Sequence, residues 1–234
     1  YHMSVKDCSR VQREFDKVFS GVGFRYLVVI TQALKNYFLE MYKNCLSEDN
    51  IIVAPDGVDL ERYKLLPNLL EAKKYFEYVD NYTVGYAGHL YPGRGIELIC
   101  TIAKRLPSIQ FLIIGGNPVD VDKQMTLVKR DCIANVRLVG FVPNSKVAQW
   151  LSACDILLMP YQKKIDVGRT NGTWGDTAKW CSPMKMFEYM ALKKLIISSN
   201  LPVLREILNE SNCIICEPDD AEQWVRSIKK AKKQ

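Results

Sequence analysis

Short runs of β-branched and other apolar residues alternate regularly with helical patterns through most of this chain of 234 residues. Six strands are predicted, at Thr83–Ala87, Gln110–Ile114, Val136–Val139, Asp155–Met159, Leu195–Ile197 and Cys213–Ile215. Helical patterns lie between them and after the last, at Ile96–Arg105, Asp122–Arg130, Ser145–Ala153, Pro183–Leu192, Val203–Leu208 and Ala221–Lys230. Because strands joined through right-handed helical crossovers lie parallel, this order predicts an α/β fold with a doubly wound parallel sheet of six strands.

A separate β-α-β pattern precedes this alternation. It consists of a buried strand at Tyr26–Ile30, a helix at Ala33–Cys45 and a strand at Ile51–Ala54. The turn signal Pro55-Asp56-Gly57 ends it, and residues 56 to 80 are mixed in character. We therefore expect a boundary or linker between two units there.

Composition narrows the class of protein further. Hydrophobic residues make up 48% and charged residues 25%, which is typical of a globular protein, and no apolar run is long enough to cross a membrane. The net charge of +6 suits an anionic ligand or an anionic membrane. Nucleic acid is disfavoured because the aromatic residues lie in apolar runs. The eight cysteines include one close pair, Cys213 and Cys216, without a second pair for zinc, so we interpret them as small buried residues of a reducing, cytoplasmic protein.

Glycine and proline gather where the predicted strands end. They occupy Gly88–Gly95, Gly115–Pro118, Gly140–Pro143 and the start of a long polar stretch, Pro160–Cys181. Ligands of open α/β sheets bind at these carboxyl ends. The GxGxxG dinucleotide motif and the phosphate-binding P-loop motif are both missing from the sequence.

Two features near these loops suit an anion. Arg94 lies between two glycines at the start of a helix, and Ser182 and Pro183 are the residue types preferred as N-cap and first helical residue. The free N–H groups of Met184 and Lys185, together with the Lys185 ammonium, favour a negative ligand. A pyrophosphate between the two features is the sharper interpretation, and solvated cations with ordinary helix capping are the alternative.

Six segments, in the right order, resemble the C-terminal, nucleotide-sugar-binding domain of retaining GT-B glycosyltransferases of family four. They are Ile51–Asp59, Val84–Gly95, Phe111–Gly116, Val136–Pro143, Ser182–Ala191 and Leu201–Glu206. The resemblance implies a Rossmann-like sheet that forms one half of a GT-B fold. It implies residues 1–57 as a remnant of the N-terminal domain with the hinge, and residues 58–234 as the donor-binding domain.

The resemblance also implies roles for individual residues. Arg94 takes the place of the family lysine that binds the donor pyrophosphate, Glu188 that of the glutamate that binds the ribose hydroxyls, and Phe141 and Val142 lie beside the base. The full set expected to bind the donor is Gly88, His89, Arg94, Gly116, Phe141, Val142, Ser182, Met184, Lys185 and Glu188.

Three positions depart from the family pattern. His89 replaces an arginine, and Trp180 stands where the E-x7-E motif has its first glutamate. Asp176 is the nearest acid and is the candidate catalytic substitute. The segment Gln162–Cys181 is longer than the family's glycine loop, and is either a lid or a surface loop.

The implied function is transfer of a sugar, with retention, from a nucleotide sugar to a glycan or lipid-linked acceptor. The nucleotide sugar is a substrate, so no cofactor is expected. Asp120-Val121-Asp122 spells a DxD motif but lies at a helix start, so nucleotide binding is predicted to need no metal. Because only about one domain fits the length, we expect an incomplete transferase. The basic C-terminal helix suggests peripheral contact with the cytoplasmic membrane face. A non-catalytic nucleotide-binding module and a nucleotide-sugar epimerase remain the alternatives.

Overall fold

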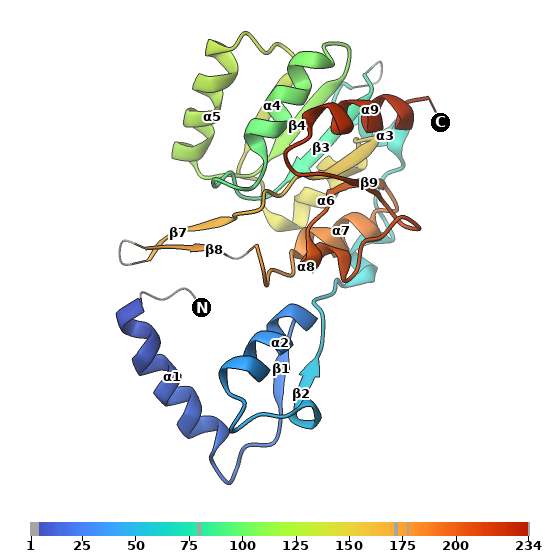
Figure 1. Cartoon of the computed structure of the whole chain (residues 1–234). Helices are drawn as coiled ribbons and strands as arrows, with labels where there is room; N and C mark the ends of the chain where they lie inside the picture. Colours follow the sequence, from blue (N-terminus) through green and yellow to red (C-terminus); the bar gives the residue numbers. More distant parts are fainter. Residues whose placement is uncertain (1–4, 79–80, 171–172, 177, 234) are drawn as a thin grey trace.

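The computed structural model describes residues 5–78, 81–170, 173–176 and 178–233, without the side chains of residues 5–9 and 166–176. Its centre is a six-stranded sheet with the order β10-β9-β6-β3-β4-β5, in which every neighbouring pair is parallel (Figure 1). The strands are β3 (Thr83–Ala87), β4 (Gln110–Ile114), β5 (Val136–Gly140), β6 (Ile156–Met159), β9 (Leu195–Ser199) and β10 (Ile214–Cys216). The predicted fold class is therefore confirmed.

Helices cover both faces of this sheet. One face packs against α4 (Ile96–Arg105), α5 (Pro118–Arg130) and α9 (Ala221–Ala231). The other packs against α3 (Leu69–Tyr75), α6 (Asn144–Ser152), α7 (Met184–Ala191) and α8 (Pro202–Arg205). Each layer buries its own apolar cluster, which is the doubly wound arrangement.

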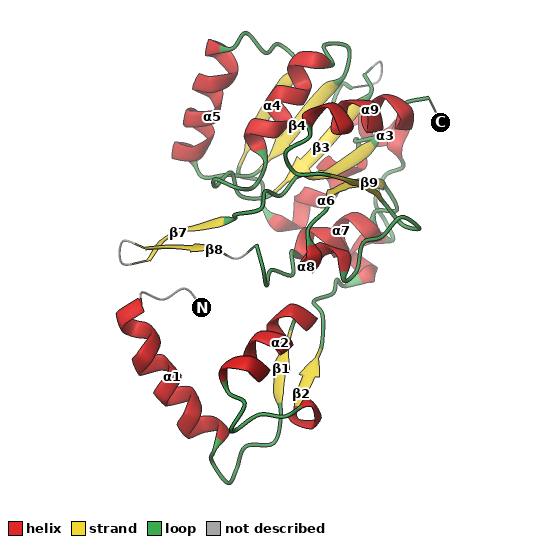
Figure 2. Ribbon diagram, in the orientation of Figure 1, coloured by secondary structure: helices red, strands yellow, loops and turns green. Residues whose placement is uncertain are grey.

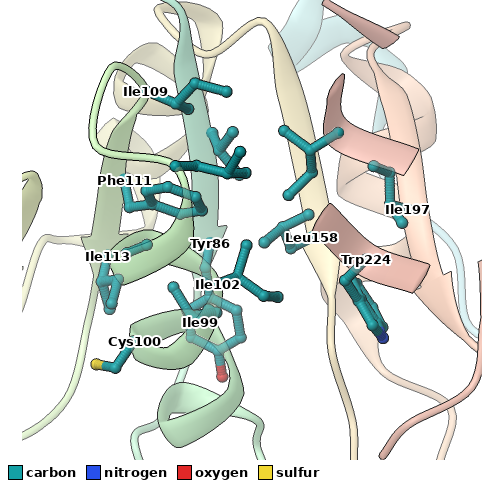
Figure 3. Packing of buried hydrophobic residues seen from close by; sticks show 14 of the residues in the cluster. Tyr86, Ile99, Cys100, Ile102, Ile109, Phe111, Ile113, Leu158, Ile197 and Trp224 are labelled. Carbon is teal, nitrogen blue, oxygen red and sulfur yellow. The ribbon is translucent and has the colours of Figure 1, made fainter. Parts of the chain in front are cut away.

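Alternation along the strands explains why two clusters form. Phe111 and Ile113 of β4 point into the cluster under α4 and α9, where Trp224 is fully buried (Figure 3). Leu112 and Ile114 belong to the cluster on the opposite face. Because both faces are covered, the strand consists of consecutive apolar residues instead of alternating apolar and polar ones.

An N-terminal unit has a separate core. It comprises α1 (Val5–Phe19), β1 (Leu27–Val29), α2 (Gln32–Met41), a short 3-10 helix η1 (Glu48–Asn50) and β2 (Ile51–Val53), which pairs with β1 in parallel (Figure 2). Its core consists of the buried hydrophobic residues Phe19, Val29, Tyr42, Leu46 and Ile51. The prediction that the strand at Tyr26–Ile30 is buried was wrong for one face, since Tyr26 is 61%, Val28 60% and Ile30 37% exposed. The assignment of this unit to a remnant domain stays a prediction.

Ordered structure also occurs where the sequence pattern was weak. The predicted linker contains the 3-10 helix η2 (Leu60–Tyr63) and α3, whose N-terminus has a capping box between Asn68 and Glu71. The long polar stretch after β6 contains an antiparallel hairpin of β7 (Asp166–Thr170) and β8 (Thr173–Asp176). The hairpin projects away from the sheet in Figure 1.

Several smaller expectations are also tested. Cys213 and Cys216 lie in the clusters on opposite faces of the sheet, as expected for a strand, whereas Cys132 is exposed instead of buried. Helix α5 begins at Pro118, four residues earlier than predicted, because the Asn117 side chain caps it. In the described part of the chain, no helix combines the length and the apolar character that a membrane span requires.

Candidate functional site

A cleft of about 760 Å³ opens at the carboxyl ends of the central strands. The β3–α4 loop, the β4–α5 loop, the residues after β5 and the start of α7 form its walls. Nine of the residues predicted to bind the donor line it, namely Gly88, His89, Arg94, Gly116, Phe141, Val142, Met184, Lys185 and Glu188. The structure thus brings these residues together, and their roles toward a ligand stay predictions.

Close backbone packing explains the glycines at one wall. Gly88 and Gly115 both have positive φ angles, and a Cβ on Gly115 would lie 2.3 Å from the carbonyl oxygen of Gly88. No side chain fits at that distance, so the β3–α4 and β4–α5 loops pack backbone against backbone. A Cβ on Gly88 would lie 3.2 Å from Lys185 Nζ, which leaves the cleft floor bare beside this ammonium.

Arg94 is one of two cations in the cleft. It lies one residue before Gly95, the left-handed N-cap of α4. Its Nη1 donates to the Tyr161 hydroxyl over 2.6 Å, and its guanidinium carbon lies 4.9 Å from the centre of the Tyr161 ring. Its Nε is buried without a partner among the described residues.

Lys185 is the second cation, and it is only 8% exposed. Its Nζ is buried and lacks a hydrogen-bond partner in the described part of the chain. The nitrogen lies 3.7 Å from the centre of the Tyr86 ring and 4.6 Å from that of Tyr161. Burial, followed by the positive charge of Arg94, lowers the pKa of Lys185 well below its ordinary value. An anion placed against Nζ would supply the missing partner and reverse this shift.

The start of α7 differs by one residue from the prediction. Pro183 is the N-cap, with ψ of 114°, so the helix begins at Met184 and Ser182 lies outside it. The predicted capping role of Ser182 is therefore wrong, and Ser182 does not line the cleft. An extended backbone at Pro183 still leaves the N–H groups of Met184 and Lys185 without acceptors inside the helix.

Glu188 follows Lys185 by nearly one turn of α7, so both side chains face the cleft. Its carboxylate is half-buried, and no hydrogen bond to it occurs among the described residues. Tyr63 of η2 lies close enough that Glu188, after burial, raises the pKa of its phenol. Phe141, 78% exposed, stands with Val142 across the cleft. A carboxylate that still has free lone pairs can accept from a vicinal diol.

His89 and the E-x7-E positions are placed as follows. The His89 ring stacks on Tyr91 with centroids 4.7 Å apart, and burial, then Arg94 and Lys185, lower its pKa, so it is a neutral imidazole at neutral pH. Trp180 contacts the N-terminal unit, since its carbonyl accepts from Thr31 Oγ1 and its ring lies 5.1 Å from that of Tyr37. Asp176 ends β8, and its side chain lies outside the described residues.

Two tyrosines of the site were missed by the sequence analysis. Tyr86 and Tyr161 are each 1% exposed and surround Lys185. Tyr86 lies in an apolar strand pattern, which predicts a core residue. Tyr161 follows the strand that ends at Met159, and its place beside Pro160 at that strand end was the only signal.

The acidic DxD motif takes part in helix capping. The Asp120 carboxylate accepts from Asn117 Nδ2 over 2.8 Å, and the Asp120 N–H donates to Asn117 Oδ1. Within the described ranges, no three His, Cys, Asp or Glu side chains are grouped as a metal site would require. Metal-independent binding stays a prediction.

Sequence comparison matches residues 81–233 to the family described as "Glycosyl transferases group 1". A 2-deoxystreptamine glucosyltransferase from Streptomyces kanamyceticus is 26% identical over 117 residues, which cover 47% of this chain and 30% of the relative. The phosphatidylinositol N-acetylglucosaminyltransferase GPI3 subunit from Saccharomyces cerevisiae is 29% identical over 117 residues, covering 48% of this chain and 26% of the relative. The chain therefore matches less than a third of the length of these curated relatives.

Structural comparison gives the same architecture at low identity. Anabaena HepE in complex with UDP and glucose superposes with a TM-score of 0.73 and 16% identity, over 100% of this chain and 61% of HepE. A glycosyltransferase from Rickettsia africae superposes with a TM-score of 0.72 and 16% identity, over 100% of this chain and 58% of that chain. These likenesses show the fold, a Rossmann-like half of a GT-B architecture.

Proposed function

This chain belongs to the glycosyl transferases group 1 family, and from that premise we propose that it forms the donor-binding part of a glycosyltransferase. In this proposal the cleft holds a nucleotide-diphosphate sugar, whose sugar is transferred to a glycan or lipid-linked acceptor with retention. The observation that carries the proposal is the pair of cleft cations, because Lys185 Nζ and Arg94 Nε are both buried and have no hydrogen-bond partner among the residues that the structure describes. Buried donors without acceptors are costly in a folded protein unless a ligand satisfies them.

The diphosphate is assigned to the space between Arg94 and Lys185. Its charge would be shared by the guanidinium, the ammonium and the first N–H groups of α7. When the bond from the anomeric carbon to the diphosphate oxygen breaks, negative charge grows on that oxygen. Fixed positive groups that are already desolvated stabilise such a leaving group without a reorganisation of solvent. Under this assignment, Arg94 and Lys185 bind the diphosphate and also help it to leave when the sugar is transferred.

The nucleoside is assigned to the opposite end of the cleft. Glu188 would accept from the ribose hydroxyls, and Phe141 and Val142 would flank the base. The HepE complexes contain UDP, which supports uracil as the first base to test here. Gly88 and Gly116 would allow close approach of the ligand to the backbone, and the neutral His89 would act as a hydrogen-bond donor at the rim.

The name of one relative supports a lipid acceptor, because it describes transfer to phosphatidylinositol. The name of the other describes transfer to 2-deoxystreptamine, which is neither a glycan nor a lipid. Exposed cations on α9 and just after it, Arg226, Lys229, Lys230, Lys232 and Lys233, would suit an anionic bilayer that carries a lipid-linked acceptor. We therefore extend the proposal to peripheral contact with the cytoplasmic membrane face.

Two matched variants test the donor site. Arg94→Ala should weaken UDP binding about tenfold or more and leave uridine nearly unchanged, because a charge-assisted contact to phosphate is worth roughly 1.5–3 kcal/mol. Glu188→Ala should weaken uridine and UDP by similar factors, and 2′-deoxyuridine should show almost no further loss in that variant. Calorimetric titration of both variants with these ligands, and with GDP and ADP, measures the effects.

The same titrations distinguish the proposal from its rivals. Equal behaviour of the two variants toward uridine and UDP would contradict the site assignment. Failure of every nucleoside diphosphate to bind the wild type would reject the donor-binding function itself. Conversion of a UDP-sugar into its epimer without any acceptor would favour the epimerase instead.

A further inference from the structure

We propose that Tyr161 is a positioning residue that holds Arg94 and Lys185 as a pair at the diphosphate subsite. This inference rests on the proposed function, because it assigns a role within the same cleft. Tyr161 is 1% exposed and follows β6 directly through Pro160. Its hydroxyl contacts Arg94, and its ring lies against both Arg94 and Lys185.

The hydroxyl fixes the arginine. Tyr161 Oη accepts from Arg94 Nη1 over 2.6 Å, a short hydrogen bond from a charged donor. Arginine has several rotatable bonds, and without a partner its guanidinium would sample many orientations. The bond to Tyr161 satisfies one end of the guanidinium, while the buried Nε stays without a partner in the described chain. The remaining donors are therefore available to an anion in one fixed orientation.

The ring lies against both cations. Its centre is 4.9 Å from the guanidinium carbon of Arg94 and 4.6 Å from Lys185 Nζ. Two like charges this close together repel each other, which opposes their assembly. The negative face of an aromatic ring attracts cations and offsets part of that repulsion. The Tyr86 ring contributes to the same attraction, with its centre 3.7 Å from Lys185 Nζ.

The Tyr161 phenol holds the two cations without cancelling their positive charge. Burial raises the pKa of Tyr161 far above its ordinary value, although Arg94 opposes the shift, so the hydroxyl stays protonated. A carboxylate in the same place would form an ion pair with Arg94 and compete with a phosphate. A neutral phenol accepts one hydrogen bond and leaves the charges of both cations for the ligand.

The backbone around Tyr161 fixes the same loop. Gln162 N–H donates to Gly93 carbonyl oxygen over 2.9 Å. Cβ atoms on Gly93 and Gly95 would each lie 1.9 Å from a carbonyl oxygen of this segment, those of Lys164 and Pro160 respectively. The loop that carries Arg94 is therefore packed against the segment that carries Tyr161. This packing fixes the position of the two side chains relative to each other.

The test is Tyr161→Phe, which removes the hydroxyl and keeps the ring. Inorganic pyrophosphate is the first ligand, because its binding does not depend on the base, and UDP and uridine follow. We expect the variant to bind pyrophosphate and UDP about tenfold more weakly, with uridine unchanged. In an Arg94→Ala background the same substitution should have no further effect on pyrophosphate, since the residue then has no guanidinium to position.

Tyr189→Phe is the matched control. Tyr189 is also a fully buried tyrosine beside the cleft, and its hydroxyl accepts from the Ala87 N–H over 2.8 Å. It does not line the cleft, so this variant should lose stability while its pyrophosphate affinity is unchanged. If Tyr161→Phe fails to fold, Arg94→Lys replaces it, because lysine keeps the charge and lacks the planar guanidinium; we expect a similar loss of pyrophosphate affinity.

The outcomes separate the two proposals. If the wild type binds pyrophosphate or UDP and Tyr161→Phe binds them equally well, the positioning role is wrong and the donor site stands. The same conclusion follows if uridine and pyrophosphate weaken by one common factor, or if the loss is undiminished in the Arg94→Ala background. If the wild type binds neither pyrophosphate nor any nucleoside diphosphate, the proposed function fails and this inference fails with it.

Discussion

Lys73 and Lys185 are each 8% exposed and lie at opposite ends of the same parallel sheet, but the surroundings of their ammonium groups differ. Near the amino ends of the strands, Lys73 Nζ donates to Asp155 Oδ2 over 2.7 Å and to the Asn81 carbonyl over 2.8 Å. The same Asp155 oxygen accepts from the Thr83 N–H, so the pair joins α3 to two strands. Near the carboxyl ends, Lys185 Nζ has two aromatic rings beside it and no acceptor among the described residues.

The difference teaches what each end of the sheet is built to do. A buried ammonium with a carboxylate and a carbonyl contributes to the folded state, because removing it would leave a buried charge behind. A buried ammonium without an acceptor costs stability, and folding does not explain its presence. Parallel α/β sheets bind ligands at their carboxyl ends, where the unsatisfied lysine lies. Lys73 thus stabilises the fold, whereas Lys185 binds a ligand under the proposed function.

The largest effect is expected from Lys73→Met. This change leaves the Asp155 carboxylate, 14% exposed, without its cation, and should lower the free energy of unfolding by about 3 kcal/mol. Urea denaturation followed by circular dichroism measures it. Lys74→Met is the control, because Lys74 is the exposed neighbour on the same helix and should change stability little. Equal stabilities of the two variants would show that the paired end contributes nothing special.

Lys185→Met should do the opposite. Methionine fills the same apolar space without a charge, so the free energy of unfolding should rise by about 1 kcal/mol. Affinity for pyrophosphate should fall by about 10- to 100-fold, because a charge-assisted contact is lost. Lys123→Met, on the exposed face of α5, serves as the control for both measurements. A variant that loses stability as Lys73→Met does would remove the distinction between the two ends.

The pH dependence of stability sharpens the comparison. The folded pKa of Lys185 lies below its ordinary value of 10.5, so between these two values the unfolded chain binds a proton that the folded chain does not. Stability of the wild type relative to Lys185→Met should therefore rise with pH through that window, by at most about 1.4 kcal/mol per pH unit. The difference should become constant above the ordinary value, where both states are neutral.

Denaturation of both proteins from pH 7 to pH 10 tests this, since all other titrating groups are common to the two chains. The groups that face Lys185 are Arg94, Tyr86, Tyr161, Cys181, His89 and Glu188. A difference that stays flat or falls with pH would mean that the Lys185 ammonium is satisfied in solution.

The sequence analysis predicted more of the carboxyl end of the sheet, where ligands bind, than of the amino end. The succession of strands and helices along the chain, the glycine loops and the cations Arg94 and Lys185 all follow from local patterns, and each lies where expected. The Lys73–Asp155 pair joins residues 82 positions apart, and only the packing of α3 near the start of β6 brings them together. Local patterns carry no information about such a contact.

Other misses have equally local causes. Ser182 resembles an N-cap, but the extended backbone at Pro183 moves the helix start past it. The apolar residues of α1, such as Phe15 and Phe19, are spaced among charges and pack on an aromatic cluster with Phe38 and Tyr42 that the sequence does not announce. The position of Tyr161 at a strand end does not reveal its role, because the hydrogen bond of its hydroxyl to Arg94 depends on the fold.

The smallest expected effect is that of removing divalent metal, which should be none. If the positive charge at the carboxyl end of the sheet comes from Arg94 and Lys185, a diphosphate needs no ion to neutralise it. Asp120, the first acid of the DxD motif, is already hydrogen-bonded to the Asn117 cap, and the described ranges contain no group of three His, Cys, Asp or Glu side chains that could hold a metal ion. UDP affinity should therefore be the same in EDTA and in millimolar Mg²⁺, while added monovalent salt should weaken it by screening. Titration in the three buffers checks this, with Arg94→Ala as the variant whose affinity should depend least on salt. A large loss of affinity in EDTA would assign the charge of the site to a metal, and a different ligand would then be needed to explain why Lys185 has no acceptor among the described residues.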